Sequence, residues 1–208
     1  WHLPFPTPKS KNYNNMILDL EKIINEKFTT PSDINEHFPA LIEYGQKCET
    51  IVEMGVRGIC STWAFLGTNP KQLTSYDIQD PAEWDQDIQD VYDTAEAYQI
   101  PFKFIQADVL KVEIDECDLL FLDTWHSYKQ LSSELRLHSD KAQKYIVFHD
   151  TTSYENHDET SYEFWGEEWK AEGIGIWRAV EEFLADNDNW VLEKRFTHNN
   201  GLTIIKRV

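Results

Sequence analysis

Short apolar stretches alternate with longer amphipathic ones along most of the chain. The apolar stretches have the length and residue types of buried strands, and they cover Thr50–Met54, Gln72–Tyr76, Phe102–Gln106, Asp118–Leu122 and Lys144–Phe148. Between and after them, helical spacing of apolar residues covers Ser61–Leu66, Asp85–Tyr98, Tyr128–Lys141 and Ile176–Asp186. Strands that alternate with helices form βαβ units, so this pattern predicts an α/β fold with a parallel sheet.

The end of the chain breaks this alternation. Trp190–Phe196 and Leu202–Lys206 both have the character of strands, and only residues 197–201 separate them. A connection this short joins antiparallel strands but cannot join parallel ones. We therefore expect a mostly parallel sheet that finishes with an antiparallel hairpin.

The N-terminal part is predicted to be helical. Met16–Phe28 carries apolar residues at helical spacing, and a second helix is expected to start with Ser32 as its N-cap and to stop near Gly45. The length of 208 residues suits one domain with a full-sized core plus an extension. We divide the chain into an N-terminal helical extension at 1–45, which would pack on the domain or cover the substrate, and a main domain at 46–208.

One connection is unusually long. Thr151–Gly175 is rich in Tyr, Trp and Glu, and connections of that length in compact domains are usually functional lids or disordered segments. The aromatic residues argue against disorder. The segment is expected to cover an acceptor molecule, or else to pack on the sheet edge as a surface helix over 163–171.

The charge of the chain excludes two classes of partner. Lys and Arg number 19 against 37 Asp and Glu, which gives a formal net charge of -18. Binding to nucleic acid or to an anionic membrane surface depends on clustered Lys and Arg, and the sequence has no such cluster. We therefore expect neither partner, and we interpret the acidity as favouring solubility.

The sequence also carries signals about location. The longest apolar runs fall far short of the roughly 20 residues that span a bilayer, and Trp1–Lys11 lacks the apolar block of a signal peptide. Cys48, Cys60 and Cys117 are scattered without a framework pattern, which indicates free thiols in a reducing compartment. A cytoplasmic location is the default expectation.

The first strand-to-helix turn has the features of a ligand-binding loop. Gly55 and Gly58 allow a tight turn, and the following helix is expected to begin near Ser61. A dinucleotide site here would show G-x-G-x-x-G, whereas this chain has G-x-x-G preceded by Glu53. A carboxylate at this place would repel pyrophosphate and favour a sulfonium or amino group. Glu53, Gly55, Gly58 and Ser61 are therefore candidate contacts for S-adenosylmethionine.

Two further acids follow the next strands. Asp77 comes 22 residues after Gly55, at the place where an acidic residue accepts hydrogen bonds from ribose hydroxyls. Asp108 follows the third strand, where a carboxylate could accept from an adenine amino group. Such acids also occur simply as helix caps or exposed loop residues, and for Asp108 the two interpretations are equally good.

The ordered motifs resemble a known family. Val52-Glu53-Met54-Gly55, Tyr76-Asp77, Ala107-Asp108 and Phe121-Leu122-Asp123-x-x-His126-Ser127-Tyr128 together resemble class I S-adenosylmethionine-dependent methyltransferases. The similarity covers about residues 30–208, and it is greatest to small-molecule O-methyltransferases of the methyltransferase-24, cephalosporin-hydroxylase-like and macrocin O-methyltransferase kind. It implies a Rossmann-like fold whose mostly parallel seven-stranded sheet ends in an antiparallel hairpin and is flanked by helices.

The second half also resembles the catechol O-methyltransferases, which bind Mg²⁺. The resemblance implies that Asp123 is a metal ligand and that His126 occupies the position of the general base. The adjacent Asp-Asn of that family corresponds to Asp150 and Thr151 here, so one ligand matches and one departs. A threonine hydroxyl is a poorer ligand than an amide carbonyl, which leaves the metal requirement open.

The same residues make chemical sense without the resemblance. Carboxylates at two neighbouring strand ends, Asp123 and Asp150, form an oxygen site that suits Mg²⁺ or Ca²⁺. A histidine nearby could accept the acceptor's proton near neutral pH, and His126 and His149 are the candidates. Asp123 could instead cap the next helix, and either histidine could be a hydrogen-bonded structural residue.

These observations predict an S-adenosylmethionine-dependent O-methyltransferase for a small hydroxylated acceptor such as a sugar or a phenol. One alternative is an NAD(P)-dependent Rossmann oxidoreductase, which the missing third glycine and the terminal hairpin disfavour. Another is a protein that binds S-adenosylmethionine without catalysis. Association into a homo-oligomer stays open at this stage.

Overall fold

The computed structural model describes residues 19–208. Within them α1 (Leu20–Thr29) is the first helix, where the sequence predicts a helix over Met16–Phe28. Residues 16–18 and the proline-containing segment Trp1–Lys11 lie outside the described part. Asp19 caps α1, because its side chain accepts a hydrogen bond from the backbone N–H of Lys22.

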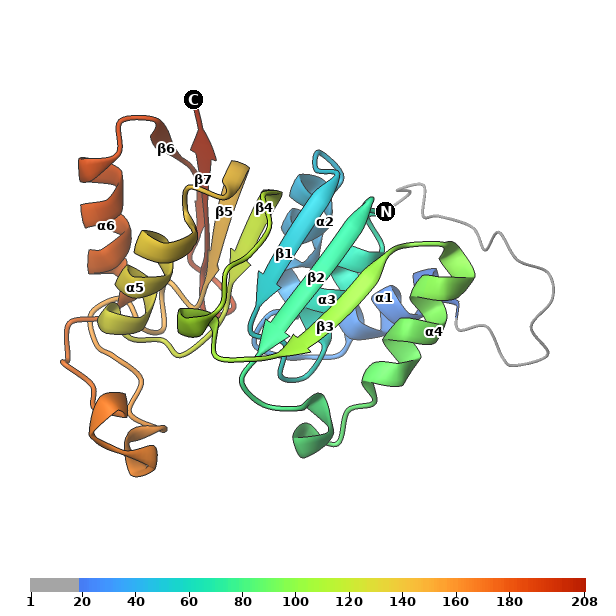
Figure 1. The fold of residues 1–208 in the computed structure, drawn as a ribbon, viewed down its shortest axis with the longest axis horizontal. Coiled ribbons are helices and arrows are strands. Elements are labelled where there is room, and N and C mark those ends of the chain that lie inside the picture. The colour runs from blue at the N-terminus through green and yellow to red at the C-terminus, as the bar shows by residue number, and fades with distance from the viewer. Residues whose placement is uncertain (1–18) are drawn as a thin grey trace.

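A seven-stranded sheet forms the centre of the molecule (Figure 1). Its strands are β1 (Thr50–Met54), β2 (Gln72–Asp77), β3 (Phe102–Gln106), β4 (Cys117–Leu122), β5 (Ala142–His149), β6 (Trp190–Phe196) and β7 (Leu202–Arg207). They lie in the order β3-β2-β1-β4-β5-β7-β6. The first five run parallel, whereas β7 is antiparallel to both β5 and β6. The predicted parallel sheet with its antiparallel finish is confirmed.

Helices cover both faces of this sheet. The others are α2 (Phe38–Gly45), α3 (Cys60–Leu66), α4 (Ile88–Tyr98), α5 (Tyr128–His138) and α6 (Ile176–Asp186). The strands are apolar on both sides, as β4 shows: Leu119 and Phe121 join a core cluster with α1–α4, while Leu120 and Leu122 join a second cluster with α5 and α6. Such two-sided burial is why the strands appear in the sequence as nearly continuous apolar runs.

The extension at the N-terminus shares the first of these two clusters. Leu20 and Ile24 of α1 and Phe38 of α2 are buried with residues of the sheet and of α3. The second helix was expected to start with Ser32 as its N-cap, but α2 begins only at Phe38, after a short 3-10 helix, η1 (Asn35–His37). The Ser32 hydroxyl accepts from the backbone N–H of Asn35 in the turn before η1. No helix among residues 19–208 is long and apolar enough to cross a membrane.

Two further helices differ from the predicted ranges. A helix was expected over Asp85–Tyr98, but a 3-10 turn, η2 (Pro81–Trp84), forms first and Asp85 takes a left-handed backbone. Asp80 closes this turn with a capping box, and Asp87 then caps α4, so capping side chains split the expected helix. Likewise α5 ends at His138 rather than Lys141, because β5 already begins at Ala142 to pair with Cys117.

Candidate functional site

A cavity of about 320 Å³ lies at the carboxyl ends of β1–β4. The chain continues from β1 to β2 and β3 on one side of the sheet, and from β4 to β5 on the other. The boundary between β1 and β4 is therefore the switch point at which open α/β sheets bind ligands. The lining includes the predicted residues Gly55, Gly58, Ser61, Asp77, Asp108, Asp123, His126 and Asp150. The fold thus brings candidates from five separate segments into one cavity.

Gly55 is sterically required at the start of the loop. Its φ is +89°, and a Cβ placed on it would lie 1.9 Å from the backbone oxygen of Asp123. Gly58, by contrast, has an ordinary φ, and its Cβ would meet nothing nearer than the Cys60 Sγ at 3.9 Å. Arg57 and Ile59 take the left-handed conformation instead. Gly58 lines the cavity, but the turn does not depend on it.

Asp77 shapes the same loop. Its Oδ2 accepts from the backbone N–H groups of Val56 at 2.7 Å and Arg57 at 2.9 Å, and its Oδ1 accepts from Gln79 at 2.9 Å. A carboxylate has about four acceptor positions, so these three bonds leave capacity for one more donor facing the cavity. Asp77 therefore has a structural role, and the predicted ribose contact is compatible with it.

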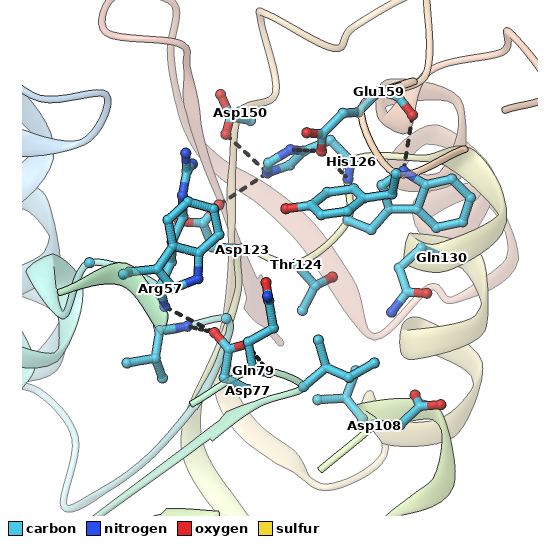
Figure 2. A pocket seen from close by; sticks show the side chains of 18 of the residues that line it. Arg57, Asp77, Gln79, Asp108, Asp123, Thr124, His126, Gln130, Asp150 and Glu159 are labelled. Carbon is cyan, nitrogen blue, oxygen red and sulfur yellow. Dashed lines mark hydrogen bonds and ion pairs between the residues drawn. The ribbon is translucent and has the colours of Figure 1, made fainter. Parts of the chain in front are cut away.

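Asp108 also has structural partners. Its Oδ1 accepts from the backbone N–H of Leu110, which caps the short helix η3 (Val109–Lys111), and its Oδ2 pairs with Lys111 at 2.9 Å. The side chain nevertheless lines the cavity. Figure 2 shows Asp108 and Asp77 at one end of the cavity, with Asp150 and Glu159 at the other.

Glu53 does not line the cavity, contrary to its predicted place in the ligand site. It is fully buried behind the loop, where it accepts from Ser61 at 2.5 Å and from Thr62 and Ser75 at 2.8 and 2.5 Å. Burial outweighs these hydrogen bonds and raises the pKa of Glu53 to about 7. The hydroxyl of Ser61 is therefore bonded to Glu53, and both residues hold β1, β2 and α3 together beneath the cavity.

His126 is the centre of a compact ionic cluster at the other end (Figure 2). Its Nε2 lies 3.1 Å from Asp123 Oδ1 and 3.0 Å from Asp150 Oδ2, while its Nδ1 lies 2.9 Å from Glu159 Oε2. The ring stacks on Tyr154 at 4.8 Å between centroids. Both ring nitrogens thus face carboxylates, and the ring is held from both sides.

The protonation of this cluster follows from its geometry. Burial disfavours the charged imidazole, but hydrogen bonds with Asp123, Asp150 and Glu159 outweigh it and raise the pKa of His126 well above its ordinary value. Burial would raise the pKa of the two aspartates, yet the neighbouring histidines hold both below their usual range. At neutral pH the cluster therefore contains an imidazolium between carboxylates, and His126 in this state is not a free base.

His149 lies behind the two aspartates and does not line the main cavity. Its Nδ1 is 3.2 Å from Asp123 Oδ1 and 3.3 Å from Asp150 Oδ2, and its Nε2 is 3.1 Å from the backbone oxygen of Asp33. Burial lowers the pKa of its ring, but the aspartates prevail and raise it to about 10. Both nitrogens are engaged, so the predicted role of His149 as a general base gives way to neutralising buried charge.

The donors of the cluster suit a divalent cation. Asp123, His126 and Asp150 each offer a ligand atom, and the three atoms lie within 4.8 Å of one another. Asp150 Oδ1 is buried and, among the described residues, no group donates to it. Thr151 is not a ligand in place of the expected asparagine, because its hydroxyl bonds to that of Thr203 at 2.9 Å. An imidazole in the set favours Mn²⁺, Fe²⁺ or Zn²⁺ beside the predicted Mg²⁺ or Ca²⁺.

Sequence reasoning missed Glu159 as a partner of His126. The two residues lie 33 positions apart, so no local motif links them. Glu159 also holds the loop through its backbone: its N–H donates to the His126 oxygen at 2.8 Å, and its oxygen accepts from the Trp125 indole at 3.0 Å. The only sequence signal was that Glu159 belongs to the long aromatic segment.

That segment lines the cavity, and it does not form the single surface helix that was the other expectation. Residues 159–171 form what we name the lid, which contains two short 3-10 helices, η4 (Glu163–Trp165) and η5 (Glu167–Trp169), rather than a helix over 163–171. Tyr162, Trp165 and Trp169 of the lid line the cavity. The positive φ of Gly166, +147°, interrupts the segment between the two turns.

Solved structures share this fold. A Corynebacterium glutamicum protein matches with a TM-score of 0.62 at 12% identity, over 96% of this chain and 92% of its own. An O-methyltransferase from Bacillus cereus in complex with S-adenosylhomocysteine matches with a TM-score of 0.57 at 9% identity, over 94% of each chain. Magnesium protoporphyrin IX methyltransferase from Synechocystis with bound S-adenosylmethionine gives 0.56 at 10% identity, over 94% of this chain and 100% of its own.

These similarities confirm the predicted Rossmann-like class I methyltransferase fold. They extend over nearly the whole chain, and the antiparallel hairpin at the end of this sheet fits that fold. No protein-family model matches the chain, and no curated protein matches its sequence.

Proposed function

We propose that this protein is an S-adenosylmethionine-dependent methyltransferase that methylates a hydroxyl group of a small acceptor. One observation carries the proposal: a single cavity joins the Gly55 loop, with Asp77 and Asp108, to the Asp123–His126–Asp150 cluster. The first end suits a nucleoside with a cationic tail, and the second suits a hydroxyl that must lose its proton. The Bacillus cereus and Synechocystis proteins with the same fold bind S-adenosylhomocysteine and S-adenosylmethionine.

The residues at the cofactor end fit such a ligand. Gly55 brings the backbone close to the cavity where any Cβ would clash. Asp77 and Asp108 line the cavity, and both keep acceptor positions for hydroxyl or amino donors. S-adenosylmethionine, when bound, would supply an electrophilic methyl group, and the acidic lining favours its positive charge.

At the other end, Asp123 and Asp150 would hold a divalent cation with His126 Nε2 as a third donor. Such a cation lowers the pKa of a bound hydroxyl and orients it. It would also lower the pKa of His126, because the cation would neutralise the charge of the aspartates that favours the protonated ring. Without a cation, His126 is the group in the cavity that can take the acceptor's proton once its own has left. The two roles of Nε2 exclude each other at any one moment.

The alternatives are weaker. An NAD(P)-dependent oxidoreductase would need a dinucleotide fold, whereas the strand order and hairpin here fit the fold of the solved methyltransferases. A binding protein without catalysis would have no need for the buried ionic cluster beside the cofactor end. We further propose a cytoplasmic location, which the free thiols of Cys48, Cys60 and Cys117 support, and leave self-association to measurement.

Ligand-dependent stability tests the proposal. S-adenosylhomocysteine at 100 times its Kd should stabilise the protein by about 2.7 kcal/mol, which raises the melting temperature, while NAD and NADP should not. Asp77→Ala should weaken that binding by roughly one to two orders of magnitude, because it removes charge-assisted hydrogen bonds and the support of the loop. Asp140→Ala, at an exposed residue outside the cavity lining, is the matched control. A melting temperature that responds to NAD instead would sink the methyltransferase proposal.

A further inference from the structure

Four aromatic rings form one wall of the cavity. This aromatic wall consists of Trp125, Tyr162, Trp165 and Trp169, all of which line the cavity. Ring centroids lie 5.2 Å apart for Trp125 and Trp169, 5.0 Å for Trp165 and Trp169, and 5.2 Å for Tyr162 and Trp165. Three of the rings come from the lid, so this wall is built by a segment outside the strands and helices of the common fold.

The wall is firmly placed but not fully covered. The Trp125 indole donates to the Glu159 backbone oxygen at 3.0 Å, which fixes its plane. Trp165 is nevertheless 37% exposed. Large apolar surface left open beside a cavity marks a place where a ligand binds. The rings therefore pack against one another, and their exposed surface is available to a ligand in the cavity.

The charged residues around the same space are mostly acidic. Asp33, Asp123, Asp150 and Glu159 line it, and Arg57 is the one Lys or Arg among the described lining residues. Arg57 already pairs with Asp33 at 3.8 Å and lies over the Trp84 ring at 4.8 Å. Asp33 and Glu159 are outside the ligand set of the proposed cation, so a phosphate or carboxylate beside the aromatic wall would still meet like charges and no unpaired Lys or Arg among the described lining residues. This selects against anionic acceptors.

Ionised carboxylates accept hydrogen bonds and cannot donate them, so the occupant must bring donors. A sugar ring offers an apolar C–H face for the aromatic wall and hydroxyl donors around its rim for the carboxylates. A phenol would satisfy the wall but brings one or two hydroxyls. We propose that the aromatic wall is the acceptor subsite for an uncharged sugar ring, with one hydroxyl turned toward the Asp123–His126–Asp150 cluster; that this sugar is the methyl acceptor rests on the function proposed above.

Saturation-transfer NMR on the full chain, with S-adenosylhomocysteine present, tests the subsite. The probes are methyl glycosides of neutral hexoses, neutral oligosaccharides, hexose 6-phosphates, methyl uronates as free acids, and catechol. Neutral probes should bind and the others should not. Preference for the oligosaccharides would indicate that the sugar belongs to a larger glycan, and equal binding of the simple glycosides would indicate a free sugar; both support the subsite.

Variants separate the wall from the lid as a whole. Trp165→Ala and Trp169→Ala should each weaken binding of the neutral probe by about tenfold or more, because stacking area is lost. Phe164→Ala is the matched control, since Phe164 belongs to the same lid, is 79% exposed and does not line the cavity. All three variants should bind S-adenosylhomocysteine as the wild type does. If Trp169→Ala does not fold, Trp165→Ala, which removes a more exposed ring, decides the question.

Failure of this proposal is distinct from failure of the proposed function. Wild type that binds S-adenosylhomocysteine but no neutral sugar, or that prefers catechol or a hexose phosphate, overturns the sugar subsite and leaves the methyltransferase in place. Wild type that binds neutral sugars through Trp165 but not S-adenosylhomocysteine keeps the subsite and overturns the methyltransferase.

Discussion

At the scale of single residues, carboxylates near the cavity have two different surroundings. Glu53 is enclosed by three hydroxyl groups and carries no nearby cation, so burial favours its neutral form. Asp150 is nearly as enclosed and the side chain of Asp123 is 22% exposed, but both face two histidines, which favour the ionised form. Sequence position alone could not predict which of these acids is neutral, because each lies in or just after a strand. The difference comes from the side chains that other segments place around each carboxyl group.

The surroundings of Glu53 predict how stability depends on pH. Its pKa is raised from 4.5 to about 7 in the folded protein. Between pH 4.5 and 7, Glu53 is therefore protonated in the folded state and ionised in the unfolded state. The contribution of Glu53 to stability is therefore full below pH 4.5 and falls as pH rises through 7. Relative to Glu53→Gln, the wild type should lose about 3 kcal/mol of unfolding free energy between pH 4.5 and 8.

Urea unfolding of both proteins at several pH values measures this difference. Subtracting Glu53→Gln removes the titration of all other groups, including His37, whose pKa burial lowers to about 4 and which therefore acts in the opposite direction. Glu49→Gln, at an exposed residue just before the same strand, is the control and should show no such pH-dependent difference. A difference between wild type and Glu53→Gln that stays constant from pH 4.5 to 8 would contradict the buried neutral acid.

The geometry of His126 predicts its part in cation binding. Its Nε2 lies about as close to Asp123 and Asp150 as ligand atoms of one ion lie to each other. His126→Ala should therefore weaken binding of Mn²⁺ by at least about tenfold, measured by calorimetry or by the EPR signal of free Mn²⁺. His157→Ala, at an exposed histidine, should bind Mn²⁺ as the wild type does. Unchanged or tighter binding by His126→Ala would remove His126 from the ligand set and favour its role as a base.

At the scale of elements, the lid is anchored at both of its ends by one buried side chain. Asp158 Oδ1 accepts from the backbone N–H groups of Tyr128 and Gly175, both at 2.9 Å, and Oδ2 accepts from Glu172 and Gly173 at 2.8 and 3.0 Å. Burial would raise the pKa of Asp158, but these four donors hold it below its ordinary value. The start of α5 and both ends of the lid are thereby joined at one carboxylate, which gives a long connection a fixed shape.

Asp158→Asn should loosen the lid without unfolding the domain. The amide keeps one acceptor oxygen but replaces the other with a donor, so two of the four backbone N–H groups lose their partner. Amide exchange at residues 172–175 should accelerate by about tenfold or more, measured by hydrogen–deuterium exchange and mass spectrometry. Exchange in β1 and β4 should stay as in the wild type. Asp188→Asn, at an exposed site, is the control, and unchanged exchange in Asp158→Asn would mean that the aromatic wall alone holds the lid.

At the scale of the whole molecule, the sequence predicts the sheet better than the site. The sequence predicted the bounds of β1, β3, α6 and β6 as the structure has them, because a Gly, Pro or Asn stands directly beside at least one end of each. The site depends on contacts that cross the sheet order. Neither the pairing of Glu159 with His126 nor the withdrawal of Glu53 behind the loop follows from spacing along one strand. The predicted strand ends indicate which segments meet at the cavity, but they do not indicate which side chains contact each other there.

The net charge of -18 acts on the molecule as a whole. Most ion pairs of the described residues are on the surface and contribute little each, so mutual repulsion of the excess acids should dominate the electrostatics. Raising NaCl from 10 to 300 mM shortens the screening length from about 30 Å to below 8 Å and should weaken this repulsion. We expect about 1 kcal/mol of stabilisation, which corresponds to a rise in Tm of about 2–4 °C.

Scanning fluorimetry at several NaCl concentrations measures this rise, and a charge-reversed variant tests its cause. Glu21 and Glu116 are exposed and, within residues 19–208, take part in no ion pair. Reversing both with Glu21→Lys and Glu116→Lys changes the net charge from -18 by two for each substitution, to -14. This variant should melt higher than the wild type at 10 mM NaCl and should gain less from added salt, whereas Glu21→Gln and Glu116→Gln together should give half the effect. A wild-type Tm that falls on addition of NaCl would mean that attractive pairs, such as those around His126, outweigh the repulsion of the surface.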